Sequence, residues 1–254
     1  MKSCLMVLLL LTTAVVPPAL AQSGGSPLPA EPEDDYDAVP DQPDVIVPIV
    51  NPTSPMTTKI AFIVDTSGSM ENGNRVKKAI AFAQSIMGAR TDELLVALLA
   101  FKDGHDRWPG LPHKGDGPAP PKGWTYFPGV PQLKSAQKWL TEQGTTGGTN
   151  PSSALKEILA EKITDLTIVL ITDGDDFDVD KFKKTIADGQ KLREKQKLGR
   201  AVIFIVGTGS RAEKHKHLQD VGKSEGGGLF VIRRPELIVP EPIADPSAQL
   251  PDDD

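Results

Sequence analysis

The sequence predicts an α/β domain with a doubly wound, mostly parallel sheet that carries helices on both faces. Three apolar runs support this fold class, at residues 60–64, 94–101 and 168–172. Continuous aliphatic runs of this kind are typical of strands that are buried on both faces of a sheet. Helical patterns alternate with the runs, which indicates βαβ units and therefore a parallel sheet. We expect this domain to span residues 57–234.

The other elements follow from residue patterns and from the Gly and Pro content. Patterns of apolar and charged residues predict helices at 75–87, 132–143, 152–162, 179–196 and 211–221. Shorter aliphatic runs predict further strands at 201–206 and 229–232. The span 102–131 is dense in Gly and Pro and is predicted to be irregular, apart from a short edge strand at 124–127.

The N-terminal segment has the pattern of an export signal. Lys2 precedes an apolar run at 5–16, and Ala19-Leu20-Ala21 forms a small-x-small cleavage site. The apolar run is short for a bilayer span, which needs about 20 residues. We therefore expect a signal peptide over 1–21, cleaved before Gln22, and a secreted or periplasmic protein without a transmembrane segment. An uncleaved N-terminal anchor is the alternative.

Two acidic, Pro-rich segments flank the predicted domain, a linker at 22–56 and a tail at 235–254. Both are expected to be disordered because they bury too little apolar surface to offset their ordering entropy, although Val45–Val47 is apolar enough to dock. The two segments hold 13 of the 34 acidic residues, and Lys2 is the one base outside the domain, so the domain has a net charge of about +6. A solvated basic surface is expected, without nucleic-acid binding, because aromatic residues are not interleaved with the bases.

Oxygen-bearing side chains follow the first predicted strand. Asp65, Ser67 and Ser69 stand at alternate positions directly after the run at 60–64. Ligands of open α/β sheets bind where such strands end. Oxygen donors without nitrogen or sulfur suit a hard divalent cation such as Mg²⁺. Taken alone this pattern is weak, since Ser and Asp are also common helix caps and turn residues.

Two later stretches add oxygen donors in a similar context. Thr149 follows a pair of glycines immediately before a predicted helix, and Asp173 directly follows the run at 168–172. Each residue also has a structural explanation. Ser69 is a candidate cap of the helix that follows it. Thr149 is a candidate cap as well, since Pro151 favours a first helical turn. Asp173 is a candidate turn residue.

Together these stretches resemble the von Willebrand factor A (VWA) family and its metal-ion-dependent adhesion site. The sequence reads DTSGSM at 65–70, GGTN at 147–150 and ITDGD at 171–175, in the order and context of that site. The resemblance covers about residues 57–234 and implies a Rossmann-like fold. Its three-part pattern is more specific than any single motif within it.

The resemblance implies a role for each of the five residues. Ser67, Ser69 and Thr149 would touch the cation directly, while Asp65 and Asp173 would act mostly through water or by orienting the serines. So few anionic ligands leave the cation electrophilic, with an open position for a Glu or Asp carboxylate of a partner protein. The implied function is protein recognition through Mg²⁺, or Mn²⁺ or Ca²⁺, without catalysis. The partner's identity and the oligomeric state stay open.

Two other functions remain as alternatives. One is a structural VWA module with a vestigial metal site, although all five ligand positions are filled. The other is a Mg²⁺-dependent phosphate-transferring enzyme, since Asp65 at a strand end superficially resembles the nucleophile of haloacid dehalogenase phosphatases. Those enzymes have a second acid two residues later, where this sequence has Ser67. The Gly-x-Ser-x-Gly and Gly-x-x-x-x-Gly-Lys motifs are also lacking.

The remaining reactive residues receive no role in this prediction. The single cysteine, Cys4, falls in the predicted signal peptide, so thiol chemistry is excluded from the mature chain. The acidic run Asp252–Asp254 is a further candidate to occupy the metal's open position from within the chain. The histidines are expected at the surface, at His105, His113, His215 and His217.

Overall fold

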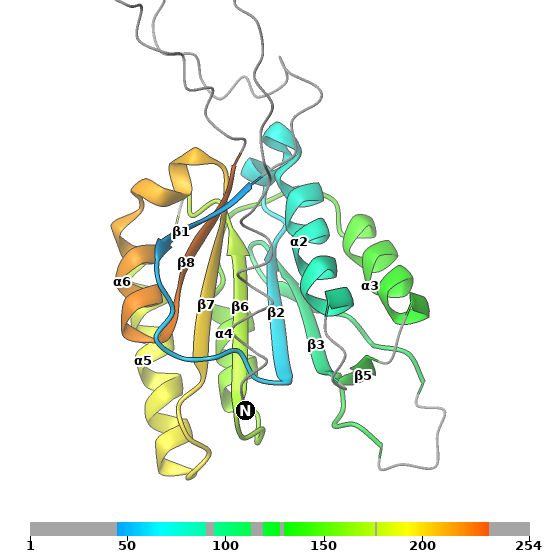
Figure 1. The fold of residues 1–254 in the computed structure, drawn as a ribbon, viewed down its shortest axis with the longest axis vertical. Coiled ribbons are helices and arrows are strands. Elements are labelled where there is room, and N and C mark those ends of the chain that lie inside the picture. The colour runs from blue at the N-terminus through cyan, green and yellow to red at the C-terminus, as the bar shows by residue number, and fades with distance from the viewer. Residues whose placement is uncertain (1–44, 90–93, 113–118, 128–129, 176, 234–254) are drawn as a thin grey trace, which may run out of the picture.

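The computed structural model describes residues 45–89, 94–112, 119–127, 130–175 and 177–233. These residues form an eight-stranded mixed sheet between two layers of helices (Figure 1). The predicted α/β fold with helices on both faces is confirmed. The predicted signal peptide, the acidic tail and most of the linker lie outside the described residues.

Five strands of the sheet run parallel to one another and form its centre. They are β2 (Lys59–Asp65), β3 (Leu94–Phe101), β6 (Leu166–Thr172), β7 (Val202–Thr208) and β8 (Gly226–Arg233). The antiparallel strands are β1 (Val45–Val50), β4 (His105–Arg107) and β5 (Thr125–Phe127). The order is β1-β8-β7-β6-β2-β3-β4, and β5 also pairs with β3. Because β2 lies between β3 and β6, its carboxyl end is near the middle of the sheet's upper edge.

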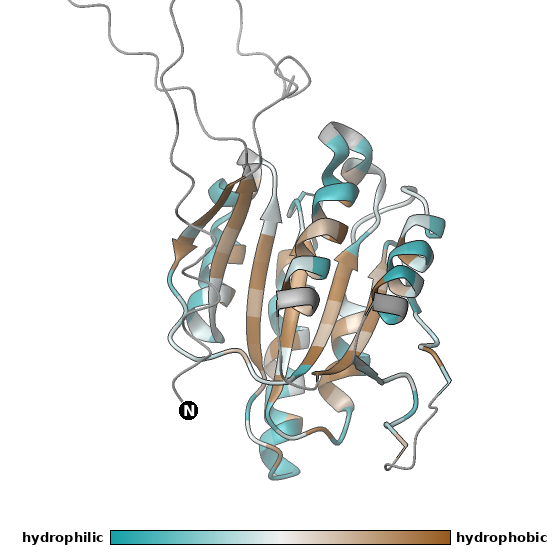
Figure 2. Cartoon of the chain, turned by 45° about the vertical axis from the view of Figure 1, so that its right-hand side comes forward, coloured by the Kyte–Doolittle hydropathy of each residue, from teal (hydrophilic) through white to brown (hydrophobic). Residues whose placement is uncertain are grey.

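The helices divide between the two faces of the sheet. One face is covered by α2 (Arg75–Ala89) and α3 (Val130–Glu142), and the other by α4 (Ser152–Ala160), α5 (Val179–Lys195) and α6 (Lys216–Ser224). Short 3₁₀ helices, η3 (Gly68–Asn74) and η4 (Ser210–Lys214), lead into α2 and α6. Figure 2 shows the apolar strands between these layers.

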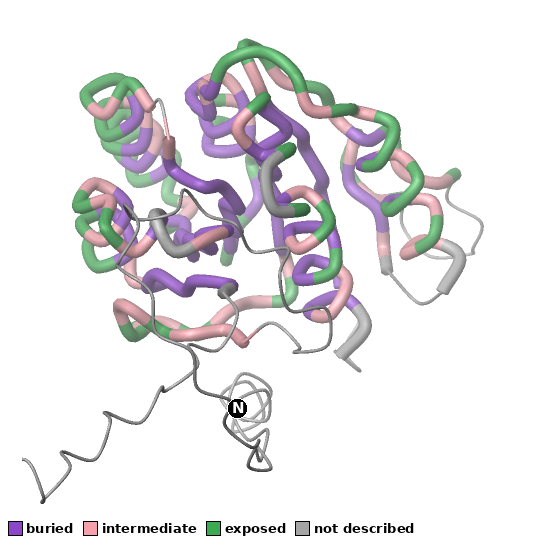
Figure 3. The backbone as a smooth tube through the Cα atoms, turned by 90° about the horizontal axis from the view of Figure 1, so that it is seen from above, coloured by how far each residue is buried: buried purple, intermediate pink, exposed green. Residues whose placement is uncertain are grey.

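Alternate residues of each central strand enter different cores. In β2, Ile60 and Phe62 pack in the cluster that includes α2, whereas Ala61 and Ile63 pack in the cluster that includes α4, and all four are fully buried. Figure 3 shows the strands as the most buried layer of the molecule. This double burial is the physical reason for the unbroken apolar runs in the sequence.

The folded domain begins earlier than predicted. Residues 22–56 were expected to be a linker, yet Val45–Val50 forms β1, which pairs antiparallel with β8 from Val45 opposite Arg233 to Val50 opposite Leu229. The linker prediction is therefore wrong for residues 45–56. The apolar residues of β1 cover the edge of β8, and Pro48 is tolerated because an edge strand needs only half of its N–H groups.

The span 102–131 is also more regular than expected. Residues His105–Arg107 form β4, which pairs with β3, although the sequence predicted no strand there. Side chains fasten this polar strand to α4: His105 Nε2 lies 2.6 Å from Glu157 Oε2, and His105 Nδ1 lies 2.9 Å from Ser153 Oγ. His105 is thus a structural contact and not a plain surface residue. The predicted edge strand at 124–127 is confirmed as β5.

The predicted helix at 211–221 is two separate elements. It divides into η4 and α6 at His215, whose backbone is extended with φ −75° and ψ 98°. The His215 side chain turns toward the β6–α5 turn, where Nε2 lies 3.0 Å from Asp175 Oδ1. The remaining helix and strand predictions agree with the structure to within three residues at each end. No helix among the described residues is long and apolar enough to cross a bilayer.

His217, at the start of α6, is a second histidine that the sequence misplaced at the surface. Its Nε2 atom is enclosed and has no hydrogen-bond partner among the described residues. Its ring packs against Phe177 and Phe182, with centroid distances of 5.5 and 6.3 Å. Burial, together with the positive charges of His215 and Lys183, lowers the pKa of His217 to about 4.

This environment predicts a loss of stability in mild acid. Between the ordinary pKa of 6.5 and about 4, the unfolded chain protonates His217 while the folded chain does not. His217 therefore favours the folded state above pH 6.5, and that contribution declines as the pH falls toward 4. Urea unfolding across this range should show that the unfolding free energy of wild type decreases relative to that of His217→Gln as the pH falls. If the unfolding free energies of the two proteins change equally with pH, His217 does not have a lowered pKa in the folded state.

Candidate metal centre

The two predicted aspartates leave neighbouring strands at the same edge of the sheet. Asp65 is the last residue of β2, and Asp173 directly follows β6. The two strands pair in parallel up to Val64 opposite Ile171. The Thr172 hydroxyl, also at this edge, donates a hydrogen bond of 2.6 Å to Asp65 Oδ2. The carboxyl ends of β2 and β6 therefore place both carboxylates where open α/β sheets bind ligands.

The turn after β2 brings two serine hydroxyls together. The Ser67 backbone N–H donates to Asp65 Oδ1 at 2.9 Å, which closes the turn. The hydroxyl oxygens of Ser67 and Ser69 then lie 3.1 Å apart. Ser69 lies within η3, and its hydroxyl is directed at Ser67 instead of capping a helix. The turn thus presents two neutral oxygen donors next to a buried carboxylate.

The glycine loop before α4 is joined to this turn by its backbone. Gly68 donates to the Gly147 carbonyl at 3.1 Å, and Thr146 donates to the Thr66 carbonyl at 3.2 Å. Gly147 has φ +84°, and a Cβ there would lie 2.7 Å from Asp103 Oδ2. The site therefore requires a glycine at 147, because a side chain would be strained and would collide with Asp103.

Thr149, at the end of this loop, is not a helix cap. The residue before α4 is Pro151, which makes no side-chain capping bond, and Asn150 Oδ1 accepts from the Ser152 backbone N–H at 3.2 Å. Thr149 is 8% exposed. Its hydroxyl makes no hydrogen bond to another residue in the described part of the chain. Thr149 therefore offers a nearly buried hydroxyl oxygen that no hydrogen bond among the described residues occupies.

An arginine that the sequence did not reveal holds Asp173 beside the serine turn. Arg75 Nη1 donates to Asp173 Oδ2 at 2.8 Å and to the Ser69 carbonyl at 3.3 Å. Both side chains of the ion pair are buried, with 8% and 1% of their surface exposed. One signal was present in the sequence: Arg75 is the first residue of α2, where the helix dipole disfavours a cation. Asp173 Oδ1 also accepts from the Asp175 N–H at 3.1 Å, so its turn role is real.

Asp65 has no opposite charge beside it in the described part of the chain. Its side chain is fully buried. Burial raises the pKa of Asp65 to about 7, and the hydrogen bonds from Ser67 and Thr172 offset this only in part. A cation at this edge of the sheet would restore the ionised form of Asp65, because an adjacent positive charge favours a carboxylate.

The residues present fit a hard cation better than a transition metal. The donors are hydroxyl and carboxylate oxygens, which Mg²⁺ prefers. No group of three or more His, Cys, Asp or Glu that could hold a metal occurs among the described residues. The structure brings Asp65, Ser67 and Ser69 into direct contact, joins Asp173 to them through Arg75, and joins the Thr149 loop through backbone bonds. The metal itself stays a prediction.

The chain is an open α/β domain whose candidate site lies at the carboxyl edge of the parallel strands. Solved structures with a similar fold can be compared with it. The von Willebrand factor type A structure from Catenulispora acidiphila has a TM-score of 0.53 at 16% identity, over 76% of this chain and 46% of that chain. BatB from Bacteroides thetaiotaomicron gives 0.45 at 16% identity, over 69% and 89%. The SpRpn10 VWA domain gives 0.44 at 16% identity, over 70% and 89%.

The likeness to the Catenulispora acidiphila structure shows that the chain has the fold of a VWA domain. At this level of identity the likeness concerns the fold alone, and the chain spans less than half of the Catenulispora acidiphila protein. No protein-family model and no curated protein matches the sequence. The role of the site therefore has to be argued from its own geometry.

Proposed function

We propose that this chain is a protein-recognition module that holds a divalent cation and docks a Glu or Asp carboxylate of a partner protein on it. The observation that carries the proposal is the fully buried Asp65, which has no counter-charge among the described residues and closes the turn in which the Ser67 and Ser69 hydroxyls lie 3.1 Å apart. Mg²⁺ is the proposed cation, with Mn²⁺ and Ca²⁺ as alternatives. Its proposed ligands and supporting residues are Asp65, Ser67, Ser69, Thr149 and Asp173.

The charges around the site favour an anionic partner. Hydroxyl ligands do not neutralise a cation, and the carboxylate of Asp173 is already paired with Arg75. With Asp65 ionised, a bound Mg²⁺ would therefore still keep a net positive charge and would attract a carboxylate oxygen at its open position. This remaining positive charge favours a role in recognising an anionic partner. A vestigial metal site would not need a charged cation with an open position.

The phosphate-transfer alternative finds less support in the geometry. Such chemistry needs a second acid two residues after Asp65, and that position is Ser67, whose N–H and hydroxyl support Asp65 and Ser69. One described histidine beside the site, His215, contacts Asp175, so its imidazole is held by an acid of the turn. We therefore propose a non-catalytic role.

Export is part of the proposal and rests on the sequence pattern of residues 1–21. The partner would then be an extracytoplasmic protein, reached after removal of the signal peptide.

The proposed function is tested by metal-dependent capture. The full chain, immobilised after purification, is exposed to extracytoplasmic proteins of its source organism in Mg²⁺ and in EDTA. We expect a partner that wild type retains in Mg²⁺, that EDTA releases, and that the Ser67→Ala/Ser69→Ala variant fails to retain. Retention that is equal in Mg²⁺ and EDTA, or equal for the variant, would reject metal-bridged docking.

A further inference from the structure

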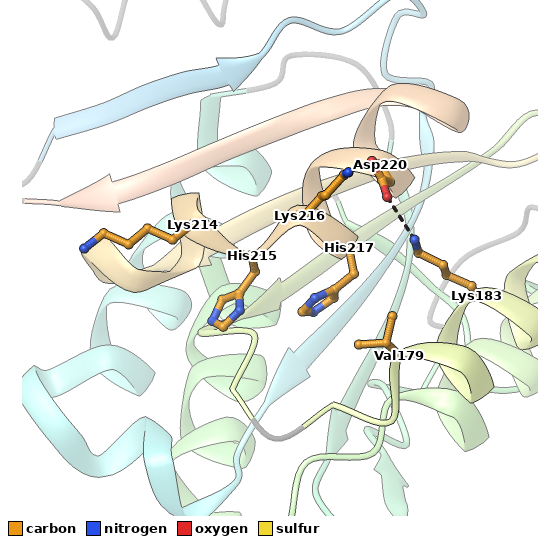
Figure 4. A pocket seen from close by; sticks show the side chains of 7 residues that line it. All are labelled: Val179, Lys183, Lys214, His215, Lys216, His217 and Asp220. Atoms are coloured by element: carbon orange, nitrogen blue, oxygen red, sulfur yellow. Dashed lines mark hydrogen bonds and ion pairs between the residues drawn. The ribbon is translucent and has the colours of Figure 1, made fainter.

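An open surface depression of about 460 Å³, called the cavity below, lies between the first turns of α5 and the corner where η4 meets α6 (Figure 4). Most of the residues that line it are basic, and their apolar stems and rings form much of its surface. The charged and imidazole side chains are Lys183, Lys214, Lys216, His215, His217 and Asp220. Neither the sequence prediction nor the proposed function gives this cavity a role.

The cavity has more positive charge than its own acid can neutralise. Lys183 is paired with Asp220 at 2.9 Å. Lys214 and Lys216 are exposed and form no ion pair with a residue in the described ranges. The Nε2 atom of His217 is enclosed without a hydrogen-bond partner among those residues. The positive charges of His215 and Lys183 also contribute to the lowered pKa of His217. The surroundings therefore favour an anion.

The cavity adjoins the candidate metal centre. His215, one wall of the cavity, lies 3.0 Å from Asp175 Oδ1 through its Nε2, and the Asp175 N–H donates to Asp173 Oδ1 at 3.1 Å. The same wall packs on Gly174, where a Cβ would lie 2.8 Å from His215 Cδ2. The turn at 173–175 is thus shared by both places. A ligand that sits on one of them has the other as its neighbour.

The basic groups are spread apart instead of converging on one point, and Lys216 projects away from the imidazoles, toward Asp220 (Figure 4). In Figure 4 the rings of His215 and His217 project side by side, with Lys214 beyond one and Lys183 beyond the other. A single compact anion would meet few of these groups at once. An extended segment with several acidic side chains would meet more of them, because successive residues of an extended chain are spaced by about 3.3 Å.

We propose that this cavity is a second anion-binding subsite, which receives acidic side chains that neighbour the docking carboxylate in an acidic segment of the partner protein. The proposal rests on the proposed function, since it extends the ligand from the metal centre into the cavity. It assigns the partner a chemical class: a peptide segment with several Glu or Asp residues in succession.

Two synthetic peptides of equal length serve as probes, one of six consecutive glutamates and one with a single glutamate among Gly and Ser. Their affinities for the full chain are measured by calorimetry at low salt, in Mg²⁺ and in EDTA. We expect the hexaglutamate to bind at least about tenfold more tightly than the single-Glu peptide in Mg²⁺. Lys214→Gln/Lys216→Gln should remove this preference, since both lysines are exposed and their change leaves the core intact.

A matched control separates the subsite from general charge attraction. Lys191→Gln/Lys195→Gln removes the same net charge from exposed positions farther along α5, and it should keep the preference for hexaglutamate. The subsite is overturned if the control loses the preference as well, if Lys214→Gln/Lys216→Gln keeps it, or if hexaglutamate shows no advantage or no binding.

The same measurement distinguishes the subsite from the proposed function. Hexaglutamate binding that is equal in Mg²⁺ and EDTA but is lost in Lys214→Gln/Lys216→Gln supports the subsite and rejects metal-bridged docking. Binding of both peptides that depends on Mg²⁺ but is insensitive to those two lysines supports the docking and rejects the subsite. As a second readout, hexaglutamate should shift the imidazole NMR signals of His217 in wild type, and an unchanged spectrum would count against the subsite.

Discussion

Replacing Ser67 and Ser69 together by alanine should lower the affinity for Mg²⁺ by about 100-fold or more, at least the loss seen when groups supporting a metal are removed. The two hydroxyls lie 3.1 Å apart beside Asp65, so both are removed from the proposed coordination shell at once. The turn itself should survive, because its closing bond to Asp65 comes from the Ser67 backbone N–H. Calorimetric titration of Mg²⁺ into the metal-free full chain measures the affinity, and thermal unfolding in EDTA checks the fold.

A control variant removes two hydroxyls away from the site. Thr141 and Thr185 donate to carbonyls of their own helices, at Gln137 and Lys181. The Thr141→Ala/Thr185→Ala variant should bind Mg²⁺ as wild type does. If the two double variants bind Mg²⁺ equally well, the serine hydroxyls are not ligands.

Replacing Arg75 by methionine should destabilise the metal-free protein by about 3–5 kcal/mol, the usual cost of breaking a buried ion pair by removal of one partner. The guanidinium is the ion-pair partner of Asp173, whose side chain is only 1% exposed. Mg²⁺ should restore part of the loss, because a bound cation supplies another positive charge near Asp173. Urea unfolding in EDTA and in Mg²⁺ measures both effects.

The double variant Arg75→Met/Asp173→Asn shows whether the two residues act as a pair. It should lose clearly less stability than the sum of the single variants, since removing both charges leaves no buried charge unpaired. Some loss should remain because Arg75 also donates to the Ser69 carbonyl. Strictly additive losses would mean that Arg75 is not the counter-charge of Asp173.

The centre of the fold was predictable because its strands are buried on both faces. The run at 60–64 reads as apolar at every position, and β2 places these residues alternately in two cores. The edges were not predictable from such patterns. β1 contains Pro48 within a segment of acidic and Pro-rich composition, and β4 consists of three polar residues. Contacts of His105 with α4 residues 48 and 52 positions away help to hold β4, as do contacts of Arg107 with Glu157 and Glu161.

The candidate site divides in the same way between local and distant contacts. Asp65, Ser67 and Ser69 form one turn, so their spacing alone indicates that they meet. The contact of Arg75 with Asp173 joins residues 98 positions apart, and no local pattern reports it. The contact of His215 with Asp175 likewise joins residues 40 positions apart, beyond the reach of a local pattern.

The most direct test of the metal centre is a crystal structure of the full chain grown with Mn²⁺ and measured with anomalous X-ray scattering. The account predicts an anomalous peak at the carboxyl edge of β2 and β6, within metal–oxygen distance of the hydroxyls of Ser67, Ser69 and Thr149. An edge without a peak in crystals that contain Mn²⁺, or a peak held by other residues, would contradict it.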